Sequence, residues 1–173
     1  MKTYAVENDM EVDLGRLTAQ PMDTEAYVQA HRSLVIPCHD VFAGYNGGIL
    51  LVRRLSFPAG GILWPLGGRV SRGMDMGASL KEKVQNESGL ELEDITELGH
   101  ARTFFSTDPF GHGRGVDTIN FVYFAKARGS LNLDRLHAEP TVVLPGEYEQ
   151  KHRGRLHPYV RDFMELALPF LNK

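Results

Sequence analysis

The stretch from Trp64 to Leu90 constrains this chain most, because it joins a glycine-rich loop directly to one amphipathic helix. Its sequence is WPLGGRVSRGMDMGASLKEKVQNESGL. The apolar residues Met76, Leu80 and Val84 are spaced i, i+4 and i+8, which places them on one face of a helix over residues 76–87. Gly89 is well placed to end that helix as a left-handed C-cap. The segment therefore predicts one well-bounded helix after a tight loop.

Apolar runs separated by turn signals predict strands on both sides of this helix. Asn46-Gly47, between the runs 34–42 and 49–54, is the clearest hairpin signal in the chain. Further strands are expected around 62–64, 95–105, 118–127 and 141–144, and helices over 23–30 and 158–168. A basic loop is expected between the last strand and the last helix. This order predicts an α/β (α+β) fold, with a mixed sheet sandwiched by helices.

The length and charge of the chain limit its organisation and its partners. A chain of 173 residues suits one globular domain with a full core. Within it, residues 1–33 are expected to form an N-terminal arm, extended or an edge strand over 1–21, with a short helix after it. Residues 34–173 are expected to form the folded domain. The net charge of −3 gives no general attraction to nucleic acid or to an anionic membrane.

Cysteine content and the lack of long apolar segments set the expected location. The single cysteine, Cys38, excludes an internal disulfide and a cysteine-rich zinc site, and we interpret it as a buried structural thiol. The acidic start MKTYAVENDMEVD has no apolar run of the kind found in signal peptides. No stretch approaches the roughly 20 apolar residues of a membrane span. A cytoplasmic location is expected.

The loop and helix resemble the Nudix box, whose pattern is G-x5-E-x7-R-E-U-x-E-E-x-G-U, where U is an aliphatic residue. The matching positions are Gly68, Val84, Glu87, Gly89 and Leu90. Four key positions differ, namely Met74, Glu82, Lys83 and Asn86. The resemblance implies a Nudix-type α/β/α sandwich and a hydrolase that uses Mg²⁺. The box here keeps its scaffold and loses most of its metal-binding charge.

The helix face that would carry metal ligands in such a box has an unusual composition. Lys83, Asn86 and Glu87 share one helix face through their i, i+3 and i+4 spacing. One ammonium, one amide and one carboxylate are a poor ligand set for Mg²⁺, which prefers oxygen ligands. We interpret Lys83 as a replacement for the metal charge, paired with Glu87. A solvated Lys–Glu pair on an exposed helix face is the alternative, and Asp75 is a candidate substitute for the first glutamate of the box.

A second stretch is similar to the GDP-mannose mannosyl hydrolase branch of the Nudix family, whose pattern is K-R-x-x-R-P-A-x-G-x-W…P-G-G-R-V. The matching residues are Arg54, Pro58, Ala59, Gly61, Gly68, Arg69 and Val70. The similarity covers roughly residues 34–145. It implies that Arg54 and Arg69 bind the substrate diphosphate, that Glu87 and the Gly68 carbonyl bind Mg²⁺, and that His137 is the general base. The departures are Phe57, Leu63, Leu66 and Leu136.

Two further residues are candidates for substrate contact. Arg114 lies in the glycine-rich loop 106–115, where Nudix proteins often determine substrate choice, although a plain mobile loop is the alternative. Tyr45, near the expected mouth of the site, is a candidate for stacking on a base, although packing is the alternative. Histidines that precede a strand, as His137 is expected to, are often surface or capping residues.

Two functions remain open from the sequence. The first is an Mg²⁺-dependent hydrolase of a nucleoside diphosphate linked to another group, with a nucleotide sugar as the expected substrate. The second is a Nudix-fold module without catalysis that binds a nucleotide, a metabolite or a protein partner. The family resemblance makes a homodimer an option, whereas composition and net charge give no role for nucleic acid or membrane. Function resides in the site and not in the fold, so the site must separate these two.

Overall fold

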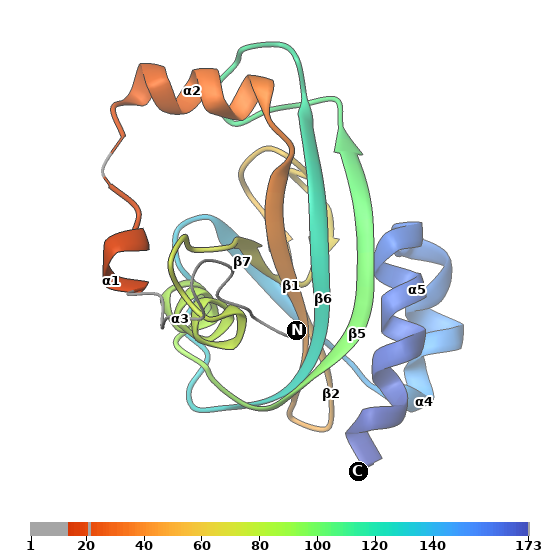
Figure 1. Ribbon diagram of the computed structural model, residues 1–173. Helices are drawn as coiled ribbons and strands as arrows, with labels where there is room; N and C mark the ends of the chain where they lie inside the picture. Colours follow the sequence, from red (N-terminus) through yellow and green to blue (C-terminus); the bar gives the residue numbers. More distant parts are fainter. Residues whose placement is uncertain (1–13, 21, 173) are drawn as a thin grey trace.

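The computed structural model describes residues 14–20 and 22–172, and it shows a mixed sheet with helices on both faces (Figure 1). The strands are β1 (Ile36–Tyr45), β2 (Gly48–Arg54), β3 (Leu63–Trp64), β4 (Leu66–Arg69), β5 (Glu91–Phe105), β6 (Val116–Arg128) and β7 (His137–Val143). The helices are α1 (Leu14–Leu17), α2 (Thr24–Ser33), α3 (Met76–Ser88), α4 (Pro145–Glu147) and α5 (Pro158–Ala167). The expected α/β (α+β) class with a mixed sheet is confirmed.

The central strand β1 organises the sheet. The strand order is β3-β2-β1-β6-β5, with β7 paired to β2 and β4 paired to β1. β1 and β6 run parallel, whereas every other pair of strands is antiparallel. One edge of β1 is shared by two partners, because β2 pairs with its residues 43–45 and β4 pairs with its residues 38–41. The sheet therefore splits beside β1.

Alternating side chains of the central strands supply two hydrophobic cores, as a period of two requires. Val41 and Ala43 face the α3 side, whereas Phe42 faces the α5 side. On the α3 side, Val41 and Ala43 belong to one cluster with Leu80 and Val84. On the α5 side, Phe42 belongs to the other cluster, which includes Met164. The apolar residues of α3 and of α5 lie on one side of each helix, so each helix covers one face of the sheet (Figure 1).

The turn between β1 and β2 and the ends of α3 follow the expected chemistry. Asn46 and Gly47 have φ values of 48° and 81°, as a two-residue hairpin turn requires. Gly89 ends α3 in the left-handed conformation, with φ 71°. At the other end, the Asp75 carboxylate accepts hydrogen bonds from the backbone N–H groups of Gly77 and Ala78. Asp75 is thus the N-cap of α3, which explains its presence beside the missing glutamate.

Several element boundaries differ from the expectation. β5 begins at residue 91 and β7 at residue 137, because the sequence alternation is broken where the strands are irregular. Asp94, for example, has φ 51° at a bulge in β5. Short helical turns occupy 145–155 where a basic loop was expected. Residues 14–17 form a helical turn where an extended arm or edge strand was expected, and residues 1–13 and 21 of that expected arm lie outside the described residues.

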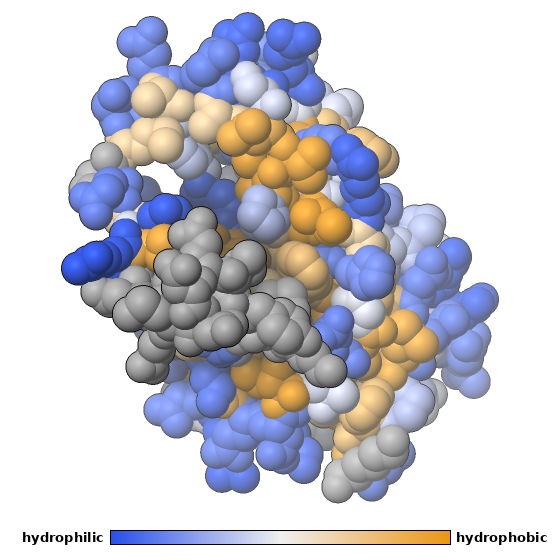
Figure 2. Space-filling view, viewed as in Figure 1, coloured by the Kyte–Doolittle hydropathy of each residue, from blue (hydrophilic) through white to orange (hydrophobic). Residues whose placement is uncertain are grey.

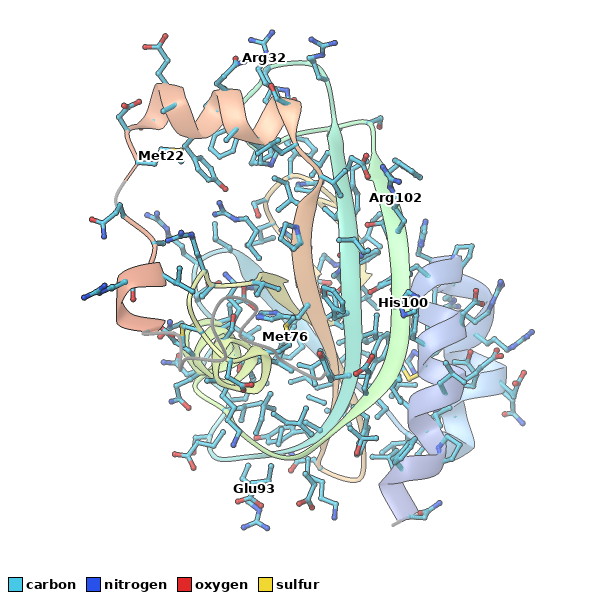
Figure 3. All side chains as sticks on the ribbon, in the orientation of Figure 1. Met22, Arg32, Met76, Glu93, His100 and Arg102 are labelled. Carbon is cyan, nitrogen blue, oxygen red and sulfur yellow. The ribbon has the colours of Figure 1, made fainter. Side chains whose placement is uncertain are left out.

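The N-terminal elements lie against the rest of the chain through specific contacts. The Arg72 guanidinium donates to the Leu17 carbonyl oxygen, which ties α1 to the loop that precedes α3. α2 crosses one end of the sheet, and Arg32 on it points away from the strands (Figure 3). Glu93 and Arg102 mark opposite ends of β5 in the same view (Figure 3). Figure 2 shows apolar surface beside α2, and Leu34, Val35 and Ile119 are among the exposed hydrophobic residues of the described chain.

No helix within the described part of the chain is both long enough and apolar enough to span a membrane.

Candidate functional site

A cavity of about 260 Å³ opens where the sheet splits, and it brings together most of the residues singled out by the sequence. Its lining residues include some from β1, β2, β4, β6, α3 and the start of β7, and also some from α2 and the loop 106–115. Five residues with expected site roles line it: Arg54, Gly68, Arg69, Glu87 and His137. We call this cavity the cleft. Lys83 and Asp40 line it as well.

The glycines of β4 make the close approach of the strands possible. The backbone of Gly67 is directly opposite Asp40 in the β1–β4 ladder. A Cβ at Gly67 would lie 2.2 Å from the His39 carbonyl oxygen, and its φ of +146° is a further strain for any other residue. The Gly67 N–H also donates to Glu87 Oε2 over 3.1 Å. This position therefore needs glycine, and it links the sheet to α3.

Glu87 is committed to two internal partners. Its side chain is only 7% exposed, and Oε1 forms an ion pair of 3.0 Å with Lys83 Nζ. The other oxygen, Oε2, accepts the Gly67 N–H. The pairing expected between Lys83 and Glu87 is thus confirmed, and it lies in the wall of the cleft rather than on an exposed helix face.

The residues at the other altered positions of the degenerate box do not line the cleft. Glu82 and Asn86 are exposed, and neither they nor Met74 line the cleft. No group of three or more His, Cys, Asp or Glu side chains is arranged to hold a metal ion within residues 14–20 and 22–172. Glu87 has both oxygens engaged, and Asp75 serves as a helix cap. The described residues do not fit the Mg²⁺ site that the resemblance implies.

His137 has an oriented imidazole. Its Nδ1 lies 2.8 Å from Asp134 Oδ1, and that same oxygen accepts the Leu136 N–H. An ionised carboxylate can only accept, so Nδ1 carries a proton, and in the neutral form of the ring Nε2 keeps its lone pair. His137 is buried and lines the cleft. The expectation that it precedes a strand is corrected, because it is the first residue of β7 and pairs with Arg54 of β2.

Two arginines present their guanidinium groups without a carboxylate partner in the described chain. Arg54 is half-buried, and its Nε is fully buried with no hydrogen-bond partner in that part of the chain. Arg69 lies at the mouth with its guanidinium 4.5 Å from the centre of the Tyr27 ring, a cation–π contact. A buried donor such as the Arg54 Nε is costly unless a ligand or water accepts from it. The pair is chemically suited to an anion.

Asp40 is a site residue that the sequence reasoning missed. It is 5% exposed, and its Oδ2 accepts a hydrogen bond of 2.6 Å from the Tyr159 hydroxyl. Burial raises the pKa of its carboxyl to about 6, although Tyr159 and Arg54 oppose that rise. Behind it Tyr159 stacks on Trp64, with ring centres 4.9 Å apart. The available signal was a charged residue inside the apolar run 34–42.

Cys38, expected to be a buried structural thiol, is half-buried and lines the cleft beside Asp40. Burial raises the pKa of its thiol to about 12, and Asp40 adds to that rise. The group is therefore a neutral thiol near pH 7, with little nucleophilic character.

The cover of the cleft is held by a chain of polar contacts. His31 Nδ1 on α2 lies 3.0 Å from His112 Nε2 in the loop 106–115. His112 Nδ1 accepts from the Arg114 N–H and lies 3.4 Å from Asp108. The Asp108 carboxylate in turn accepts three backbone N–H groups of the loop. Phe110 packs edge-on against Tyr27 and His31. We call this set of contacts the clasp.

The remaining two candidates do not reach the cleft. The Tyr45 hydroxyl donates to the Gly129 carbonyl oxygen at the hairpin end of β1, and Tyr45 does not line the cavity. Arg114 is exposed on the outside of the loop and does not line the cavity either. The expectation for Arg114 rested on the position of its loop in the Nudix family, and the expectation for Tyr45 did not show that β1 carries this residue to its far end.

Comparison with known proteins identifies the fold. The sequence matches no protein-family model and no curated protein. The structure is similar to a MutT NUDIX hydrolase from Burkholderia pseudomallei, with TM-score 0.61 and 19% identity, over 78% of this chain and 98% of that one. It is also similar to a MutT protein from Methanosarcina mazei Go1, with TM-score 0.60 and 21% identity, over 80% and 96% of the two chains.

A bifunctional NMN adenylyltransferase/ADP ribose pyrophosphatase from Francisella tularensis gives a TM-score of 0.59 at 13% identity, over 85% of this chain and 44% of that one. At these identities the likeness shows the architecture alone. The chain has the Nudix hydrolase fold.

Proposed function

We propose that this protein hydrolyses a nucleoside diphosphate linked to another group, with a nucleotide sugar as the substrate class. The observation that carries the proposal is the imidazole of His137, which Asp134 orients at 2.8 Å so that Nε2 is the free base in the cleft. A histidine whose ordinary pKa lies near neutrality is well suited to general base catalysis. The fold of the chain agrees with this class of reaction.

The cleft residues have different roles in the proposed reaction. Arg54 and Arg69 bind the diphosphate oxygens, because both guanidinium groups line the cleft without a carboxylate partner among residues 14–20 and 22–172. His137 Nε2 takes a proton from water as the water oxygen bonds to the sugar carbon. The bond from that carbon to the phosphate oxygen breaks, and the leaving diphosphate keeps the electron pair. The two arginines stabilise that developing charge.

A second function is favoured by one specific contact. Glu87 is the only carboxylate of the box that the chain retains, and it is paired with Lys83 at 3.0 Å. A cleft that keeps its anion-binding arginines but has lost its metal ligands suits a module that binds a nucleotide or a related metabolite without turnover. The two functions predict the same ligand class and differ in catalysis.

Turnover of a panel of nucleotide sugars and dinucleotides, with added Mg²⁺ and with EDTA, tests the proposal. His137→Gln should lower kcat by about 100-fold or more, because general base catalysis contributes roughly 10²–10⁴-fold. The matched control is His100→Gln, since His100 is exposed on β5 outside the cleft (Figure 3). Equal turnover by the His137→Gln variant would refute the role of His137. Saturable binding of the panel without any turnover would establish the binding module instead.

A further inference from the structure

We propose that Lys83 is a tethered cation that takes the place of the divalent metal, so that the cleft binds its diphosphate ligand without Mg²⁺. The diphosphate as ligand rests on the function proposed above. The replacement of the metal by Lys83 rests on separate contacts. These contacts concern the carboxylate, the space for the lysine and the charge of the cleft.

The carboxylate that would bind a metal has no free oxygen. Glu87 Oε1 lies 3.0 Å from Lys83 Nζ, and Oε2 accepts the Gly67 N–H over 3.1 Å. The first contact lies within one helical turn of α3, and the second joins α3 to the neighbouring strand β4. A metal at this position would have to displace an ammonium that is already bound to a carboxylate 93% shielded from solvent. The charge of Glu87 is therefore balanced before any ligand arrives.

The backbone makes room for the lysine stem. A Cβ at Gly68 would lie 2.7 Å from Lys83 Cε and 3.4 Å from Nζ, so only glycine at this position accepts the lysine where it is. The Lys83 side chain remains 39% exposed, and Lys83 lines the cleft. An ammonium has three N–H donors, and Glu87 uses one. Donors thus remain for a phosphate oxygen.

The cleft has an excess of positive charge without added metal. Arg54, Arg69 and Lys83 contribute three positive charges, and Glu87 offsets one of them. Asp40 is the other carboxyl that lines the cleft, and burial raises its pKa to about 6. With Asp40 ionised at pH 7 the cleft keeps one positive charge in excess, and neither arginine forms a salt bridge with a carboxylate of the described residues. Bare diphosphate anions are attracted to such a surface.

Metal binding measured without any ligand tests the replacement directly. Electron paramagnetic resonance of Mn²⁺ should show no micromolar binding to the unmodified protein. Lys83→Glu should bind Mn²⁺, because it places a second carboxylate four residues before Glu87 and removes the ammonium. Lys81→Glu is the matched control, since Lys81 is an exposed lysine of the same helix outside the cleft and the change in charge is identical. It should bind no Mn²⁺.

Titration calorimetry with inorganic pyrophosphate tests the ligand role. The unmodified protein should bind pyrophosphate equally in EDTA and in Mg²⁺. Lys83→Met should weaken binding about 10-fold or more, and Lys81→Met should not, because a charge-assisted contact contributes on this scale. Lys83→Gln serves as a second variant, and circular dichroism shows that each variant is folded.

The outcomes separate this proposal from the function on which it rests. Micromolar Mn²⁺ binding to the unmodified protein, or pyrophosphate binding that requires Mg²⁺, would overturn the role of Lys83 and leave the proposed hydrolase intact. Mn²⁺ binding by Lys83→Glu alone, with no pyrophosphate binding in any condition, would support the replacement of the metal and overturn the diphosphate as ligand.

Discussion

Asp40 is an acid held inside the molecule by a single strong contact, the hydrogen bond from Tyr159. Burial raises the pKa of its carboxyl from 3.8 to about 6, so keeping it ionised at higher pH has a cost in free energy. An acid whose pKa is higher in the folded state than in the unfolded chain stabilises the fold most when the pH is below its pKa in the unfolded chain. That contribution is lost as pH rises through about 6. Asp40 therefore makes the fold less stable in mild alkali than in mild acid.

Asp40→Asn should remove this dependence and keep the contact, because the amide oxygen still accepts from Tyr159. We expect the free energy of unfolding to rise by roughly 2–3 kcal/mol at about pH 8 and to change little at about pH 4. Urea unfolding at both values measures this. Asp117→Asn is the control, since Asp117 pairs with Arg102 at the surface. If Asp40→Asn lowers the free energy of unfolding at both pH values, the prediction is contradicted.

At this scale the sequence predicted pairs that are close along the chain. The Lys83–Glu87 pair follows from i, i+4 spacing alone, and His137 came from a family pattern. The sequence also placed Asp134 three residues before His137, but only the turn between them shows that the two side chains meet. Tyr159 is far from Asp40 in sequence, and no local pattern predicts their contact.

The clasp should make α2 sensitive to acid. A hydrogen bond between two imidazoles needs one of them neutral, and burial lowers the pKa of His31, helped by His112 and opposed by Asp108. For a histidine whose folded pKa is lowered, the unfolded form binds more protons as pH falls. The stability that the neutral His31 contributes is then present above about pH 6.5 and is lost below it.

We expect hydrogen-exchange protection factors of α2 to fall several-fold between about pH 7.5 and pH 5.5. His31→Leu should abolish this dependence, because leucine cannot take up a proton. The turn at Asn46 and Gly47, remote from the clasp, provides the internal reference. The same pH dependence in His31→Leu would show that α2 is not controlled by the clasp.

Element types were predictable where a local rule sets them, and boundaries were not. The Asn-Gly turn and the Gly89 cap are local, since both positions need positive φ. The start of β5 was missed because the bulge at Asp94 interrupts alternation, and the helical turns at 145–155 contain too few apolar residues to show a helical period. The docking of α2 depends on Phe110 and His112, which lie far along the chain.

Across the whole molecule, the sheet separates two hydrophobic cores. Leu80 and Met164 are both fully buried, on opposite sides of the sheet. Each change to alanine should cost about 2–5 kcal/mol. The double variant should lose the sum within about 0.5 kcal/mol, because the two side chains share no partner. Urea unfolding followed by circular dichroism checks this. If the loss in the double variant differs from the sum of the two single losses by more than about 1 kcal/mol, the two cores are coupled through the sheet.

The class of the fold was accessible from the order of its elements, but the sheet order was not. Strand alternation shows which side chains share a face, yet it does not identify the neighbouring strand. The antiparallel neighbours β1 and β2 are joined by a two-residue turn, which makes that pair predictable. The pairing of β1 with both β4 and β6, which makes the cleft, depends on long-range packing.

The parallel pairing of β1 and β6 also has a consequence for synthesis on the ribosome. Ile36 pairs with Thr118, and the ladder continues to Gly44 and Lys126. One edge of β1 therefore has no partner strand until translation has passed residue 118, whereas β2 and β4 can occupy the other edge early. Non-local pairing of this kind is slow and leaves an apolar strand edge open to other chains in the meantime. The nascent chain is most prone to aggregation while β6 is still being made.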